Sequence, residues 1–121
     1  RRQVGNNHNE LVAPSSGLLR IVSLVPNPEG KDSGREQLTI QNTSDRDVSL
    51  RGWSLMDAAK HRLNLAGTLP AKSKKVIVLK AEEMPLNNDG DTIILLNRGA
   101  EVQQVRYGAG QAGSGVRLLV R

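Results

Sequence analysis

The chain contains no cysteine among its 121 residues. This absence excludes disulfide bonds, thiolate metal sites and a cysteine nucleophile, and it leaves the redox compartment of the protein open. No apolar run comes near the roughly 20 residues that a helix needs to cross a bilayer, so we expect no membrane insertion. The chain opens on Arg-Arg-Gln, without an initiator methionine or a recognisable signal peptide, and we therefore expect it to be a piece of a longer protein.

Aromatic side chains are also scarce, because Phe is absent and Trp53 and Tyr107 are the sole Trp and Tyr. The core must therefore consist of Leu, Val and Ile, with one or two rings to fill it. Burial removes roughly 150–250 Å² of an indole from water, whereas a recognition role needs exposed neighbours to stack on. We interpret Trp53 as a core residue, and we assign three further residues to the core: Leu38, Ile40 and Leu55.

Side chains for catalysis or metal binding are few and scattered. His8 and His61 lie far apart in the sequence, and no Ser-His-Asp arrangement is apparent. The segment Asn87–Asp91 has the Asn, Asp and Gly residues typical of a calcium-binding loop, but an EF-hand register would place Pro85 and Leu96 at ligand positions. We interpret it as a hairpin turn in which Gly90 takes a positive φ. We predict no catalytic residue, no metal ligand and no cofactor.

Short apolar or alternating runs follow one another along the chain. Leu18–Val25 is an apolar run of strand length, and in Arg35–Asn42 the apolar residues alternate with polar ones. Further strands are expected at Val48–Leu50, Trp53–Met56, Arg62–Leu65, Lys74–Lys80, Asp91–Asn97, Val102–Tyr107 and Val116–Val120. About eight or nine short strands, separated by Gly and Pro turns, predict an all-β sandwich or barrel.

The first 17 residues differ from the remainder of the chain. They lack sustained periodicity and are rich in Asn, Ser, Gly and Pro. We predict that residues 1–17 are a linker or loosely ordered lead-in, with room for a short paired stretch around Leu11–Ala13. The domain itself is then expected over residues 18–121.

The blocks E-Q-L-T-I-Q-N and V-S-L-R-G-W-S-L-M-D, at residues 36–42 and 48–57, resemble the signature of the lamin tail domain. In that signature a Glu-led strand ends in Asn, a polar turn follows, and a short strand closes in Gly-Trp-x-Leu-x-Asp. Three later blocks follow in the order of the family: GTLPAKSKKVIVL, GDTIILLNRGAEVQQVRY and GQAGSGVRLLV. The resemblance covers about residues 18–120, although Gln37 stands where many relatives carry an aromatic residue.

This resemblance implies an immunoglobulin-like β-sandwich of about eight or nine short antiparallel strands, and a noncatalytic module. In lamins the module contributes to contacts with chromatin and with nuclear-envelope proteins. In bacteria it is usually appended to secreted or surface enzymes, often nucleases, phosphatases or metallo-β-lactamase-like hydrolases, and we expect an extracytoplasmic bacterial protein. The fold alone does not decide among these roles.

Seventeen basic residues against twelve acidic ones give the chain a net charge of +5. Such a surplus favours anionic partners. The densest basic group consists of Lys72, Lys74 and Lys75, with Lys80 at the far end of the same predicted strand, and we regard these four as candidate binding residues. They could contact DNA phosphates without reading bases. Lysines that flank an apolar strand also discourage aggregation through its edge.

The predicted strands K-K-V-I-V-L-K and D-T-I-I-L-L-N are apolar on both faces, more than a half-solvated sheet needs. Either they are central strands crossed by loops, or one face docks onto a partner protein, a neighbouring domain or a second copy. We predict a noncatalytic module for docking, tethering or spacing within a larger protein. The alternatives are a nonspecific electrostatic DNA-binding module and an accessory domain of a secreted hydrolase.

Overall fold

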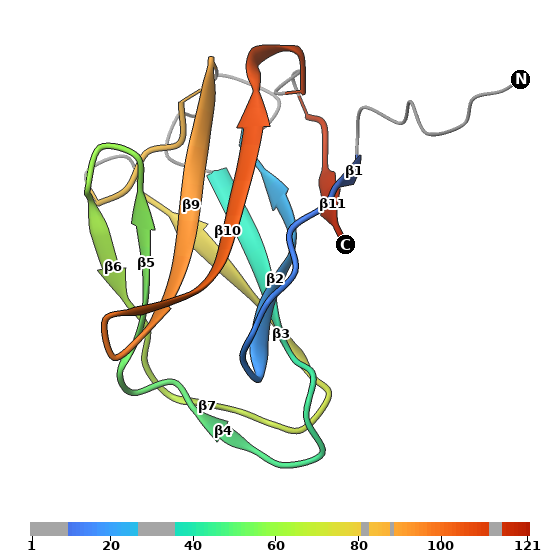
Figure 1. The fold of residues 1–121 in the computed structure, drawn as a ribbon, viewed down its shortest axis with the longest axis vertical. Coiled ribbons are helices and arrows are strands. Elements are labelled where there is room, and N and C mark those ends of the chain that lie inside the picture. The colour runs from blue at the N-terminus through green and yellow to red at the C-terminus, as the bar shows by residue number, and fades with distance from the viewer. Residues whose placement is uncertain (1–9, 27–35, 81–82, 88, 112–114) are drawn as a thin grey trace, which may run out of the picture.

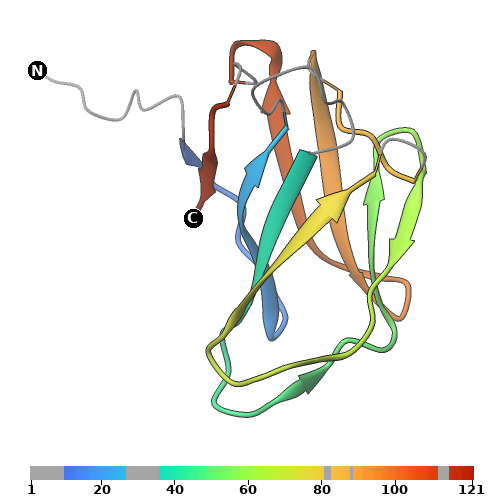
Figure 2. The same cartoon turned by 180° about the vertical axis from the view of Figure 1, so that it is seen from behind.

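The computed structural model describes residues 10–26, 36–80, 83–87, 89–111 and 115–121. In these ranges the chain forms eleven strands and one short 3-10 helix, Ala109–Gln111. The two larger sheets face each other, as Figures 1 and 2 show from opposite sides. This arrangement confirms the predicted all-β immunoglobulin-like sandwich. In the described part of the chain, no helix is long and apolar enough to cross a membrane.

The larger sheet has five strands in the order β1-β11-β2-β3-β8. Their bounds are Glu10–Leu11 for β1, Leu19–Val25 for β2, Glu36–Asn42 for β3, Lys74–Leu79 for β8 and Leu118–Val120 for β11. All neighbours are antiparallel except β1 and β11, which run parallel. The predicted alternation is visible in β3, where Leu38 and Ile40 face the core while Gln37 and Gln41 are half-buried on the other side.

The second sheet has four strands in the order β10-β9-β5-β6. Their bounds are Trp53–Asp57 for β5, Arg62–Asn64 for β6, Gly90–Asn97 for β9 and Ala100–Gly108 for β10. A separate two-stranded ladder pairs β4, Val48–Ser49, with β7, Thr68–Leu69. The strand count exceeds the expected eight or nine because β1 and β7 are only two residues long, too short to show a period.

The core between the sheets is aliphatic, as the absence of Phe requires. Leu38, Ile40 and Leu55 are fully buried, and Trp53 is only 5% exposed. Gly17 covers the indole: a Cβ at this position would lie 3.3 Å from Cη2 of Trp53 and 2.8 Å from Cγ1 of Val102. The segment before β2 can therefore close over the ring only because residue 17 has no side chain.

Asn42, the last residue of β3, connects three segments through its buried side chain. Its Nδ2 donates hydrogen bonds to the carbonyls of Arg46 (2.7 Å), Leu69 (2.9 Å) and Pro70 (3.1 Å). Its Oδ1 accepts a bond from the amide of Ser44 at 2.9 Å. The Asn that ends the signature strand thus fixes the polar turn and attaches it to β7.

Gln103 of β10 connects the two sheets from inside the core. Its Oε1 accepts a 2.6 Å hydrogen bond from the amide of Ile21 in β2, and its Nε2 donates to the carbonyl of Ala13 at 2.7 Å. The amide of Ala13 in turn donates to the carbonyl of Arg121 at 2.8 Å. Residues 10–13, which lie within the predicted lead-in, are therefore paired with the five-stranded sheet.

The turn before β9 has the predicted chemistry but a different place in the fold. Gly90 has φ 119°, and the side chains of Asn87 and Asp91 accept hydrogen bonds from backbone amides of this turn. However, β8 and β9 belong to different sheets, so the prediction of a hairpin was wrong. Local turn chemistry does not reveal with which strand the next one pairs. Residue 88 lies outside the described residues.

Candidate functional site

Of the four lysines predicted as candidate binding residues, Lys74 and Lys75 lie on β8, Lys72 lies on the turn before it, and Lys80 directly follows its last residue. Nζ of Lys72 donates to the carbonyl of Thr43 at 2.8 Å and lies 3.4 Å from Oδ1 of Asp45. Nζ of Lys75 lies 3.5 Å from the carbonyl oxygen of Ala66. Lys80 follows Lys74 by six positions, which is about 20 Å along an extended chain. The structure thus spreads the four charges along an edge, and their role in binding stays a prediction.

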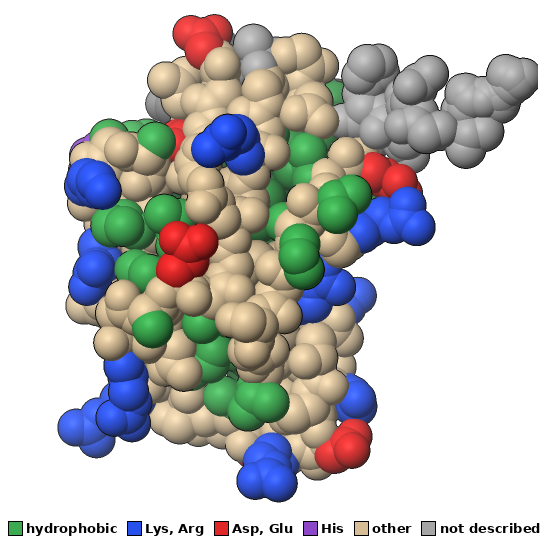
Figure 3. All heavy atoms as spheres, viewed as in Figure 1, with side chains coloured by type: hydrophobic (Ala, Val, Ile, Leu, Met, Phe, Trp, Pro, Cys, Tyr) green, Lys and Arg blue, Asp and Glu red, His purple; other side chains and the backbone are tan. Residues whose placement is uncertain are grey.

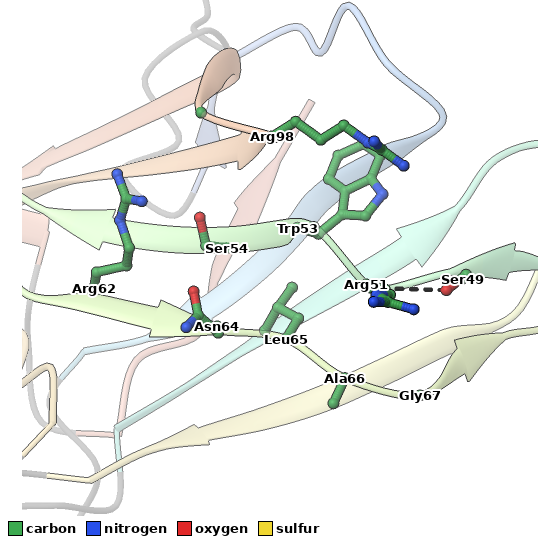
Figure 4. A pocket seen from close by; sticks show the side chains of 12 residues that line it. Ser49, Arg51, Trp53, Ser54, Arg62, Asn64, Leu65, Ala66, Gly67 and Arg98 are labelled. Atoms are coloured by element: carbon green, nitrogen blue, oxygen red, sulfur yellow. Dashed lines mark hydrogen bonds between the residues drawn. The ribbon is translucent and has the colours of Figure 1, made fainter.

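A pocket of about 740 Å³ lies elsewhere, at the end of the four-stranded sheet where β5 begins (Figure 4). It is lined by the end of β4, the β4–β5 loop, strands β5 and β6, the β6–β7 loop and the β9–β10 turn. Its lining residues are Ser49, Arg51, Gly52, Trp53, Ser54, Arg62, Asn64, Leu65, Ala66, Gly67, Arg98 and Gly99. We call it the arginine pocket after Arg51, Arg62 and Arg98.

Two Arg-Gly turns form one end of this pocket. Gly52 has φ 88° and Gly99 has φ 85°, both in the left-handed region that favours glycine. The amide of Arg98 donates a 2.7 Å hydrogen bond to the carbonyl of Gly52, which joins the two turns. The sequence repeats Arg-Gly because each turn needs a glycine, and each turn places an arginine beside the pocket.

The opposite side of the pocket follows from strand pairing. Ser54 of β5 lies across from Asn64 of β6, and Met56 lies across from Arg62. Leu55, between them in the chain, is fully buried, so its neighbours Ser54 and Met56 point away from the core. The polar partners on β6 therefore stand on the outer face of the sheet.

Trp53 belongs both to the core and to the pocket wall. Its side chain is buried, yet the residue borders the pocket. Figure 4 shows the Arg98 side chain running from the β9–β10 turn toward the indole. Trp53, which we interpreted as a core residue instead of a recognition residue, belongs to the buried core cluster.

The charge of the pocket has one sign. Its lining contains three arginines and neither Asp nor Glu. Within the described ranges, none of the three forms a salt bridge. Figure 3 shows basic side chains along the side of the molecule where β5 and β6 lie. A guanidinium presents several N–H donors in a rigid fork that matches carboxylate or phosphate oxygens. The pocket is therefore suited to an anionic ligand.

The remaining titratable side chains have structural roles. Asp57, the Asp of the signature, accepts hydrogen bonds from the amide and from Nδ1 of His61, both at 2.8 Å, and so closes the β5–β6 turn. The hydroxyl of Tyr107 donates to the carbonyl of Asn87 at 2.7 Å. Among the described residues, no group of three or more His, Asp or Glu side chains is placed to hold a metal ion. His8 lies outside those residues.

Sequence reasoning missed the three arginines. The signal that could have found two of them is the pair of Arg-Gly dipeptides at predicted turns, residues 51–52 and 98–99. Nothing in the sequence says that these turns meet, because they lie 47 positions apart and belong to different strand connections.

The comparisons with known proteins agree with this architecture. The family profile of the Lamin Tail Domain matches residues 12–109, well over half of the chain, and that range includes the signature strands and all the residues that line the pocket. A search among curated proteins finds no match. The chain therefore belongs to the lamin tail domain family, a noncatalytic immunoglobulin-like family.

Proposed function

We propose that this domain is a noncatalytic docking module that holds an acidic segment of a partner protein in the arginine pocket. The observation that carries the proposal is the convergence of Arg51, Arg62 and Arg98 on one pocket whose lining has no carboxylate. A volume of about 740 Å³ admits several side chains of a peptide or a small ligand. Ser54 and Asn64 add neutral donors between the arginines.

Charge complementarity favours a carboxylate-rich partner over an apolar one. The three arginines reach the pocket from different elements, so a ligand with several separated negative groups can contact more than one of them. Exposed ion pairs contribute only about 0.2–1 kcal/mol each, which makes a multivalent acidic segment a better fit than a single anion.

Trp53 can report ligand binding, because it is the single Trp of the chain and borders the pocket. A hexaglutamate peptide is titrated into the protein while Trp53 fluorescence and its indole N–H resonance are followed. We expect binding that weakens with salt. Each single Arg→Gln change at residue 51, 62 or 98 should weaken it about two- to fivefold, and the triple change more than tenfold.

Arg106→Gln is the matched control, since Arg106 is exposed on β10 outside the pocket and the change removes the same charge. If Arg106→Gln weakens binding as much as Arg98→Gln, only the overall charge matters and the pocket has no role. A 12-base-pair DNA duplex forms a second arm. Duplex binding that is tighter than peptide binding and lost in the triple variant would replace the proposal by the DNA-binding alternative.

A further inference from the structure

Strand β8 forms one end of the five-stranded sheet, so among the described residues one of its two backbone edges has no partner strand. Its register with β3 places Val76 opposite Thr39 and Val78 opposite Gln37, on the face away from the core. Val76 and Val78 are 54% and 52% exposed, while Ile77 and Leu79 between and beside them are buried. In the described part of the chain, β8 is therefore an edge strand and not the central strand crossed by loops that was one of its two interpretations.

Charged residues mark both ends of the same outward row. Lys74 precedes Val76 by two residues and Lys80 follows Val78 by two, and all four are exposed. Residues two apart on a strand share a face, so Lys74 shares the outer face with Val76 and Val78. Lys80 directly follows the last residue of β8, and a one-residue extension of the strand would add it to the same row. An unpaired edge with exposed valines is a template for a further strand.

A second copy of this chain is a poor occupant of that edge. An antiparallel pairing of β8 with itself, centred on Ile77, would match the valines but would set Lys74 of each copy opposite Lys80 of the other. Like charges directly opposite each other destabilise a strand pair. Shifting the register by two residues places a lysine opposite a valine and shortens the ladder. The lysines therefore oppose self-pairing and favour a partner of the opposite charge.

We propose that the free edge of β8 accepts an extended segment as an added antiparallel strand, with the pattern acid-x-apolar-x-apolar-x-acid. Its two acidic side chains lie opposite Lys80 and Lys74, and its two apolar side chains lie opposite Val78 and Val76. The main chain supplies the hydrogen bonds and the alternate side chains supply the selectivity, as in other cases of strand addition. This site does not depend on the arginine pocket, because it lies on the other sheet.

The test compares two seven-residue peptides on the unaltered chain: Glu-Thr-Val-Thr-Val-Thr-Glu and the same peptide with Lys at both ends. We expect the first to bind at least fivefold more tightly and to slow amide hydrogen exchange in β8. The double variant Lys74→Glu, Lys80→Glu should reverse this preference. Equal binding of the two peptides to the unaltered chain would overturn the proposal, whether or not the variant folds.

A second measurement separates strand addition from contact through side chains alone. Two versions of the first peptide carry N-methyl groups on alternate amides, one on the even and one on the odd positions. In an added strand only one of these sets faces β8, so we expect one version to bind and the other to lose binding more than tenfold. Equal binding of both versions excludes an added strand. A β8-dependent dimer of the peptide-free protein in sedimentation would also contradict the proposal.

Discussion

The amide of Arg98 donates a hydrogen bond to the carbonyl of Gly52 over 2.7 Å. This single bond joins the turn that begins the signature strand to the turn between β9 and β10, and both turns carry an arginine of the pocket. The shape of the pocket therefore depends on the backbone geometry at Gly52.

Gly52→Ala should destabilise the domain by about 1–2 kcal/mol, because residue 52 has φ 88° and a Cβ there would lie 3.3 Å from Cγ of Arg98. Urea unfolding measures the loss. Gly99→Ala is a matched control, since it has φ 85° but no atom within 4 Å of the added Cβ. We expect Gly52→Ala, but not Gly99→Ala, to displace Arg98, and equal effects on the Trp53 indole resonance would contradict this.

Trp53→Ala should cost about 3–5 kcal/mol of unfolding free energy, because it opens a cavity in a core without Phe. Trp53→Phe retains a ring and should cost less. Chemical unfolding followed by circular dichroism measures both variants, since the fluorescent reporter is lost with the indole. No loss beyond experimental error in Trp53→Ala would show that the ring does not support the core.

Asn42→Asp should destabilise the domain more than Asn42→Ala, although Asp has nearly the shape of Asn. The Asp carboxylate would face three carbonyl oxygens that Nδ2 of Asn42 now satisfies. Asn42→Ala leaves these groups unpaired, at about 1–3 kcal/mol for each that stays buried. Thermal and urea unfolding rank the variants, with Gln41→Ala as a control expected within about 0.5 kcal/mol of the parent. The reverse order of Asp and Ala would refute the hydrogen-bond account.

Tyr107 should make the domain sensitive to alkaline pH. Burial raises the pKa of its hydroxyl, and the negative charges of Asp91 and Glu36 raise it further. An unfolded chain releases this proton near pH ~10, so the stabilisation is complete below that pH and is lost as pH rises toward the folded-state pKa.

Above about pH 10 the unfolding free energy of the parent should therefore fall more steeply than that of Tyr107→Phe, by up to about 1.4 kcal/mol per pH unit. Near pH 7 the variant should lose about 0.5–1.5 kcal/mol, the contribution of the hydrogen bond to Asn87. Lysine titration affects both proteins alike. Parallel stability curves above pH 10 would show that Tyr107 titrates normally.

Much of the fold could be predicted because most of its strands have a local sequence pattern. The alternation around Leu38 and Ile40 predicted β3, and Gly-Trp with its family signature predicted the start of β5. The places that failed depend on contacts between distant segments. The turn before β9 has the residue types of a hairpin turn, yet β9 pairs with β5 and β10 and not with β8.

The arginine pocket could not be predicted because it, too, is formed by segments that are distant in the sequence. The candidate lysines lie close together in the sequence, whereas Arg51, Arg62 and Arg98 come from a loop, a strand and a turn that line one pocket only in the folded chain. Likewise, the valines of β8 were recognised as surplus apolar surface, but only the strand order shows that they stand at an edge.

The parallel pairing of β1 with β11 gives the domain a particular response to mechanical force. Leu11 and Ala13 are bonded to Arg121 through two backbone hydrogen bonds of 2.8 Å each. Because the two strands run in the same direction, tension applied through the two ends of the domain pulls them past each other along their length. Their hydrogen bonds are then loaded together in shear instead of being opened one at a time, and Gln103 anchors the same segment to the core. A module connected in this way can transmit tension before its core is disturbed.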